Sequence, residues 1–326
     1  MTQPSYLNRY GYLLLVIPPL IVIQLSLLLF ERSIDPGIPL TDYLRQQASA
    51  SPMLEPSQIF TEARARYTWF ALALLDIIVP TIAAAVSITI ILRSATRAQI
   101  HVMSLLGLLL AAGSCAYAFI GSNGLKQMVY GYTFDTLSAS GRFSEAFLAD
   151  VFRIIVVINV IAAIVPVIML LGACSTLAPR PTQAGDPNDW AGRMRQLKEI
   201  INASSAYLVF GILHMGAWLQ WPAALVSDEI LSKVLTELAR SITIYWGVSF
   251  TLIIITIYTP AAFFLHLRAK RLLIDQAIAD PEKWLSAHEL SITLGKQLPQ
   301  LVIMLGPFFA GPLSSLLPGM HAFGSG

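Results

Sequence analysis

The sequence predicts an all-α fold: a polytopic helical membrane protein with six transmembrane helices and a possible seventh or re-entrant segment near the C-terminus. Three observations support this class. Of the 326 residues, 56% are hydrophobic and only 12% are charged, whereas soluble domains carry about 25% charged residues. Six apolar runs have the length of about 20 residues that crosses a bilayer. Nearly all Asp, Glu, Lys and Arg residues fall outside these runs.

The predicted spans cover residues 11–30, 69–92, 102–121, 154–177, 205–226 and 242–267. The first run is followed by Glu31 and Arg32 and has no small-residue cleavage site, so we expect a retained helix and not a cleaved signal peptide. The second, fourth and sixth runs contain Pro80, Pro166 and Pro260. Membrane helices tolerate proline because neighbouring groups can satisfy the carbonyl that it leaves unpaired.

Basic residues in the loops predict the orientation. Residues 268–271, with the sequence Arg-Ala-Lys-Arg, directly follow the sixth run, and basic residues concentrate on the cytoplasmic side of membrane proteins. We therefore expect both termini to be cytoplasmic, with outer loops at residues 31–68 and 122–150. The six-span transmembrane domain would cover residues 1–271.

The remaining residues, 272–326, are expected to form a cytoplasmic or membrane-associated helical tail to which a protein partner could bind. The apolar run at residues 301–317 is short for a span and contains two Gly-Pro pairs. Three arrangements stay open for it: a segment packed on the protein or lying in the interface, a re-entrant or seventh span, and an oligomerisation helix.

Asp76 is the one formally charged side chain that falls inside the predicted spans. An ionised carboxylate in hydrocarbon is costly unless it is paired, hydrated or protonated. We therefore expect Asp76 to face the protein interior and to be hydrogen-bonded mainly by a polar neighbour such as Asn159. Arg66 is about 15 Å away along the same helix, too far to pair with it.

Gln24, Asp76, Asn159 and Gln220 share a predicted depth of roughly 8–10 Å below the outer ends of their spans. This depth predicts a polar layer around one cavity; incidental polarity near helix ends is the alternative. His214 is expected about one and a half turns deeper. It is a candidate proton relay or partner of Asp76, although direct pairing would need helix tilt or a bridging water, and a plain interhelical hydrogen bond is the alternative role.

Small residues in the third run indicate a close helix contact. Gly107, Ala111 and Cys115 recur at a spacing of four residues, which places them on one helix face and lets two backbones approach. We expect this face to serve helix packing or self-association, and the chain to form a homo-oligomer. The cysteines, Cys115 and Cys174, fit no metal-ligand spacing and are interpreted as small packing residues.

Several function classes lack support. The sequence has no Walker A loop, no His-Glu-x-x-His, no Gly-x-Ser-x-Gly and no paired histidines for haem, so we expect no enzyme, no metal site and no cofactor. A net charge of +2 without a dense basic run argues against binding of nucleic acid.

The expected function is a permeation or transport pathway for an ion or a small solute, formed by a lipid-embedded protein of the bacterial inner (plasma) membrane. The intramembrane carboxylate is the feature that favours this function, because such groups often mark ion pathways. The alternative is a membrane signalling or effector scaffold whose outer loops or cytoplasmic tail bind a partner.

Overall fold

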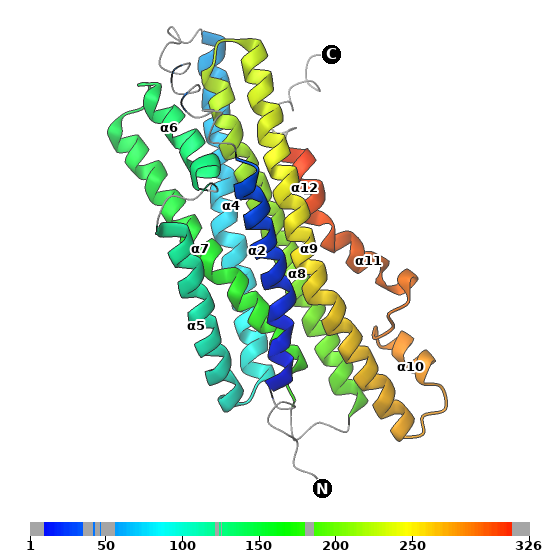
Figure 1. Cartoon of the computed structure of the whole chain (residues 1–326). Helices are drawn as coiled ribbons and strands as arrows, with labels where there is room; N and C mark the ends of the chain where they lie inside the picture. The colour runs from blue at the N-terminus through cyan, green and yellow to red at the C-terminus, as the bar shows by residue number, and fades with distance from the viewer. Residues whose placement is uncertain are drawn as a thin grey trace.

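The computed structural model describes residues 10–34, 56–120, 126–179 and 186–314, together with Asp42, Gln46 and Gly124. Every regular element in this part of the chain is helical, as the composition predicts. The long helices lie side by side in one elongated bundle (Figure 1).

Six helices of the described part are long and apolar enough to cross a membrane, which confirms the predicted number of spans. They are η1 with α2 (Gly11–Val16 and Ile17–Arg32), α4 (Pro56–Ser94), α5 (Arg97–Phe119), α7 (Glu145–Leu177), α8 with η3 (Pro187–Gln220 and Trp221–Leu225) and α9 (Glu229–Asp275). Several of them continue beyond the apolar runs into polar residues. The chain is therefore an all-helical integral membrane protein.

Capping residues set where these helices begin. Thr96 and Gln99 form a capping box at the start of α5, in which each side chain accepts a hydrogen bond from the backbone N–H of the other residue. Ser144 caps α7, and Asp186 and Asp228 cap α8 and α9 by accepting hydrogen bonds from backbone N–H groups of the first turn. Polar caps thus lie at the ends of helices whose middle parts are apolar.

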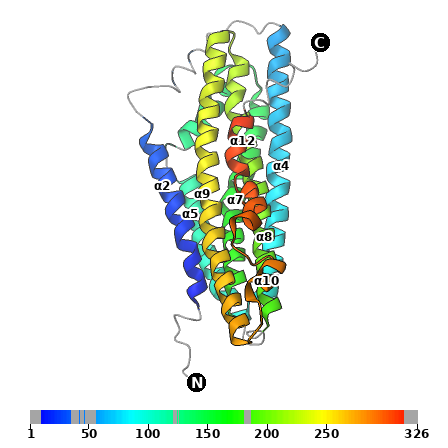
Figure 2. The ribbon, with the colours of Figure 1, turned by 90° about the vertical axis from the view of Figure 1, so that its right-hand side faces the viewer.

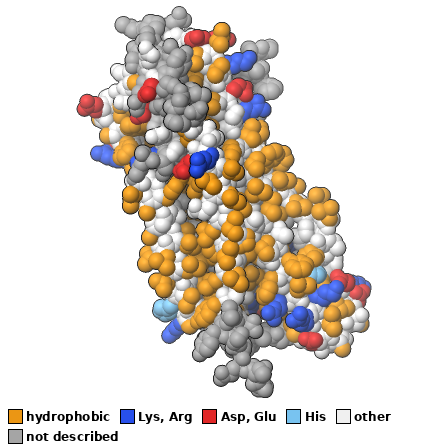
Figure 3. Space-filling view, viewed as in Figure 1, with side chains coloured by type: hydrophobic (Ala, Val, Ile, Leu, Met, Phe, Trp, Pro, Cys, Tyr) orange, Lys and Arg blue, Asp and Glu red, His pale blue; other side chains and the backbone are white. Residues whose placement is uncertain are grey.

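The centre of the bundle is formed by α4, α7, α8 and α9. Helix α4 packs against α7 and α8, and α8 packs against α9. Helix α2 lies on α9, and α5 lies at the edge against α7 (Figure 1). Hydrophobic side chains cover the middle of the visible face, while Lys, Arg, Asp and Glu gather toward its two ends (Figure 3). This distribution suits a surface embedded in lipid.

The segment between α5 and α7 folds against the bundle as the π-helical turn η2 (Lys126–Gly131) and α6 (Tyr132–Ala139). The indole N–H of Trp218 on α8 donates to the Val129 carbonyl at 2.7 Å, and the Thr133 hydroxyl donates to the Trp218 carbonyl at 2.9 Å. Part of the second predicted outer loop therefore belongs to the packed core around α8.

After α9 the chain turns back along the bundle (Figure 2). Helices α10 (Pro281–Ala287) and α11 (Leu294–Met304) lead to α12 (Gly306–Ser314), which packs against both α8 and α9. The described part of the 301–317 run is thus packed along two of the membrane-length helices.

Close backbone approaches hold α12 in this position. A Cβ atom placed on Gly247 of α9 would lie 2.6 Å from the carbonyl oxygen of Pro307, so a side chain there would clash with the α12 backbone. The Gln220 amide at the end of α8 donates to the Ser314 carbonyl at 3.0 Å. Ser314, the last described residue, therefore lies beside Gln220 at the C-terminal end of α8. This end of the bundle is opposite the one that carries residues 268–271.

Candidate functional site

Asp76 on α4 and His214 on α8 form a buried pair. Oδ2 of Asp76 lies 3.1 Å from Nδ1 of His214, and the two residues are 5% and 8% exposed. The expectation that Asn159 would be the main partner is wrong, whereas His214, which the sequence offered as a possible partner of Asp76, makes the contact directly. The depths from which Asn159 was chosen were counted from the ends of apolar runs, whereas α4 extends to Pro56 and starts far above its run.

The pair leaves one polar atom open. A neutral imidazole that donates its Nδ1–H to Asp76 carries a free lone pair on Nε2. Nε2 of His214 is buried and has no hydrogen-bond partner within the described part of the chain. Because buried polar groups are normally hydrogen-bonded, a water molecule or a ligand would satisfy this atom. The site therefore contains an ionisable pair, Asp76 and His214, and beside it one buried nitrogen, Nε2 of His214, that can still form a hydrogen bond.

Tryptophan rings enclose the histidine. The Trp69 ring centre lies 5.8 Å from that of His214, 5.2 Å from that of Trp218 and 5.5 Å from that of Trp221. Trp69 and Trp221 have no exposed surface. This packed aromatic cluster covers one side of the imidazole.

A cavity of about 140 Å³ lies beside the pair and is called the central cavity below. Four aromatic residues contribute to its lining, namely Tyr130, Tyr207, Trp218 and Phe250. Gly211 also lines it, and a Cβ atom on this glycine would lie 3.7 Å from Oδ1 of Asp76. The glycine keeps one side of the carboxylate open, and the cavity is large enough for water.

Two prolines remove helix hydrogen bonds at the central cavity. Because proline has no N–H, Pro80 leaves the carbonyl of Asp76 without its donor four residues later, and Pro166 does the same to the carbonyl of Ala162. Asp76 and Ala162 both line the central cavity. Two of the helices that form the cavity therefore have a weakened hydrogen-bond ladder at that place.

An outer cavity of about 350 Å³ adjoins the central one and lies between η2, α6 and the ends of α5 and α7. The two cavities share Tyr130 and Ile155 in their linings. Lys126, Asp135 and Asn159 line the outer cavity. Asn159 and Asp76 thus lie in neighbouring cavities that share Tyr130 in their linings.

An inner cavity of about 280 Å³ adjoins the central one on the other side, toward the end of the bundle that carries residues 268–271. The two share four lining residues: Ala162, Tyr207, Leu208 and Phe250. The lining of the inner cavity is mainly aliphatic. The buried pair therefore lies between two larger cavities, and charged and amide side chains are found in the lining of the outer one.

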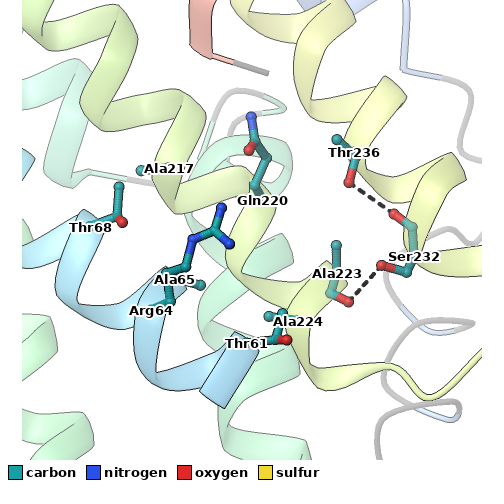
Figure 4. A pocket seen from close by; sticks show the side chains of 10 residues that line it. All are labelled: Thr61, Arg64, Ala65, Thr68, Ala217, Gln220, Ala223, Ala224, Ser232 and Thr236. Atoms are coloured by element: carbon teal, nitrogen blue, oxygen red, sulfur yellow. Dashed lines mark hydrogen bonds between the residues drawn. The ribbon is translucent and has the colours of Figure 1, made fainter. Parts of the chain in front are cut away.

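Two residues of the predicted polar layer lie apart from the pair. Gln24 is exposed on α2. Gln220 is buried, and its Oε1 has no partner among the described residues. Gln220 and Arg64 line a separate cavity of about 110 Å³ at the outer ends of α4, α8 and α9 (Figure 4). The single layer expected from the sequence is therefore divided between different sites.

The nearby arginines pair with acids of their own helices. Nε of Arg66 lies 3.1 Å from a carboxylate oxygen of Glu62, and Arg153 lies 2.8 Å from Asp150 on the exposed surface. Among the described residues, the basic side chain that contacts the Asp76 carboxylate is that of His214. The carboxylate is thus paired with a titratable group and not with a permanent cation.

Gly107 lies where α5 meets α7, because a Cβ atom on it would lie 2.8 Å from Cδ1 of Leu171. Ala111 and Cys115 are partly exposed on the same helix. Cys115 and Cys174 are free thiols. The described residues contain no group of three or more His, Cys, Asp or Glu side chains that could hold a metal ion.

Sequence reasoning missed Tyr130, Tyr207 and Gly211. A signal for the last two was available, because Tyr207, Gly211, His214 and Trp218 follow the spacing i, i+4, i+7 and i+11 that marks one helix face. No comparable signal exists for Tyr130, which comes from the short turn η2.

The fold and the site define a class: a helical integral membrane protein with an ionisable pair buried inside its bundle. Comparisons with known proteins found no matching family model, no matching curated protein and no matching solved structure. The functional argument therefore rests on the residues themselves.

Proposed function

We propose that this chain is a membrane transport protein in which Asp76 and His214 bind and release a proton as an ion or a small solute passes through the bundle. The observation that supports this proposal best is the buried pair beside a cavity that adjoins larger cavities on both sides. Ionisable groups inside membrane bundles commonly belong to ion pathways and proton relays.

The surroundings of Asp76 also weigh against a purely structural scaffold. A scaffold would be expected to cap the carboxylate with a permanent cation and to leave no cavity beside it. Here the partner is an imidazole, a group that can both accept and donate a proton. The cavity beside the pair gives a proton or a solute a place to arrive.

For orientation, the proposal keeps the basic end of α9, residues 268–271, in the cytoplasm. The contact of Ser314 with Gln220 supports a C-terminal segment that crosses the membrane as a seventh span, in place of the cytoplasmic tail expected from the sequence. The positive-charge rule suits a plasma membrane such as the bacterial inner membrane. Self-association stays a prediction.

Cysteine labelling from the two sides of the membrane tests this topology. In a protein with Cys115 and Cys174 replaced by alanine, single cysteines at Arg45, at Gly185 and after Gly326 should be labelled from outside, inside and outside. Labelling of the C-terminal cysteine from inside would restore the original expectation for the tail.

Proton flux tests the proposed activity. The purified protein is placed in liposomes that contain a pH-sensitive dye, and a potassium diffusion potential drives cation entry. Wild-type liposomes should acidify faster than empty ones, and Asp76→Asn should remove most of this difference. Asp150→Asn, which changes an exposed carboxylate, is the matched control and should acidify like wild type. Equal rates for wild type and a folded Asp76→Asn protein would refute the proposal.

A further inference from the structure

The inner cavity is built to hold an apolar group. It is enclosed by α2, α5, α7, α8 and α9, and its polar side chains are those of Ser114, Ser204 and Tyr207. The inner cavity of about 280 Å³ and the central cavity of about 140 Å³ together fall within the size range of pockets that bind small organic ligands, roughly 300–1,000 Å³. Aliphatic walls of this kind favour a hydrocarbon chain over a hydrated ion.

The inner cavity is open toward the lipid. Ser114 of α5 and Ala162 and Pro166 of α7 line it and are exposed at the surface of the chain. Tyr117 of α5 donates to a carboxylate oxygen of Glu31 at 2.8 Å, which ties α5 to α2 at the outer end, above the cavity. A molecule dissolved in the membrane can therefore reach the cavity from the side.

The polar end of the combined space is suited to a cation. Asp76 is the carboxylate in the lining of the central cavity, and the aromatic residues Tyr130, Tyr207, Trp218 and Phe250 line the same space. Aromatic rings attract a cation placed over their faces, and aromatic cages are a common way to bind an ammonium group. An anionic head group would instead meet the charge of Asp76.

We propose that the central and inner cavities together bind an amphiphilic ammonium compound, with its cationic head beside Asp76 and its apolar tail in the inner cavity. This inference rests on the proposed transport function, because it names the class of substrate for the same site. The compound enters sideways from the membrane, past Ala162 and Pro166.

Proton and ligand compete for one carboxylate. The titratable groups that face Asp76 in the central cavity are His214 and Tyr207 from α8 and Tyr130 from η2; α7 and α9 contribute the uncharged residues Ile155, Ile158, Ala162 and Phe250. When the pair carries one proton in addition to the imidazole Nδ1–H, a bound ammonium takes over the neutralisation of the Asp76 carboxylate and the added proton leaves to water, so cation binding to the protonated pair releases one proton. This exchange links ligand movement to proton movement.

Equilibrium dialysis tests the inference directly. The probe is hexyltrimethylammonium, dialysed against the full chain in phosphatidylcholine nanodiscs, with empty nanodiscs as the blank. Hexanol and hexyl sulfate are the neutral and anionic compounds with the same tail. We expect saturable binding of the cation that weakens as the pH is lowered. Asp76→Asn should weaken it at least tenfold, whereas Asp150→Asn should bind like wild type.

A second variant tests the apolar half of the site. Ala162→Phe narrows the junction of the two cavities and should weaken hexyltrimethylammonium more than tetramethylammonium, which has no tail. Thermal unfolding of each variant shows that it is folded. Binding of the cation no better than to empty nanodiscs overturns the inference. Equal binding of hexanol overturns it also, since the cavity would then hold any apolar chain.

The two proposals fail separately. Proton flux that depends on Asp76 without cation binding keeps the transport function and rejects the ammonium substrate. Cation binding that depends on Asp76 without any proton flux keeps the ligand site and rejects proton-linked transport.

Discussion

Replacing His214 with leucine separates the energetic roles of the two partners in the buried pair. The change leaves the Asp76 carboxyl without its imidazole. Breaking a dry buried ion pair costs about 3–5 kcal/mol, whereas leaving one hydrogen-bonding group unsatisfied costs about 1–3 kcal/mol. The central cavity of about 140 Å³ can bring water to the carboxyl, so we expect the lower range.

Asp76→Asn should behave differently, because the amide oxygen still accepts the Nδ1–H of His214. The side chain keeps its size and the pair keeps one hydrogen bond. We therefore expect a loss of less than about 1 kcal/mol. Asp76→Leu removes that acceptor and should resemble His214→Leu. The double variant with leucine at both positions should be less destabilised than the sum of the two single variants, because contacting residues are not additive.

The assay is reversible unfolding in mixtures of dodecyl maltoside and sodium dodecyl sulfate, followed by circular dichroism. His101→Leu changes an exposed histidine on α5 and serves as the matched control, with an expected change near zero. Additive effects of Asp76→Leu and His214→Leu would show that the two side chains do not interact, and would remove the basis of the proposed site.

Three further predictions concern the rest of the fold. The Lys198 ammonium, 2.9 Å from Glu289, holds the pKa of that carboxyl below its usual range. The resulting stabilisation is present above the ordinary carboxyl pKa and is lost as the pH falls through the lowered pKa, so the protection factors of the backbone amides in α10 should fall in acid in wild type and vary less with pH in Lys198→Ala. Gly247→Leu should release α12 and increase its proteolysis, because the side chain would overlap the α12 backbone. Gly107→Leu should lower the free energy of unfolding by about 1–3 kcal/mol, because the new side chain crowds Leu171; an unchanged free energy of unfolding would mean that α5 can move away from α7.

The number and positions of the membrane-length helices follow from the sequence because the bilayer imposes a simple requirement. A span needs about 20 apolar residues, and this chain contains runs of that length separated by charged or proline-containing loops. The ends of the helices were less predictable. Helix α4 begins at Pro56, far before its apolar run, because polar residues such as Glu62 are held there by Trp221 and Arg66.

The packing of the C-terminal run shows a second limit. Its two Gly-Pro pairs indicated a broken segment, but not the surface on which it packs. That surface depends on Gly216 of α8 and Gly247 of α9, which give α12 room to approach: Cβ atoms placed on them would lie 2.5 Å from Ser314 and 2.6 Å from Pro307. Glycines on two helices far apart in sequence define one groove only after the bundle has formed.

The pairing of Asp76 with His214 depends on the same kind of information. Each residue was a reasonable candidate alone, because an ionisable group in a span needs a partner. The face Tyr207, Gly211, His214 and Trp218 is visible in the sequence of α8, yet nothing in it says that α4 is the helix it meets. The structure supplies that contact, and Gly211 allows it by leaving space beside the carboxylate. A larger side chain at position 211 would fill this space while Asp76 and His214 keep their own side chains. A substitution of Gly211 therefore tests whether the site needs the cavity, whereas substitutions of Asp76 and His214 test whether it needs the ionisable pair.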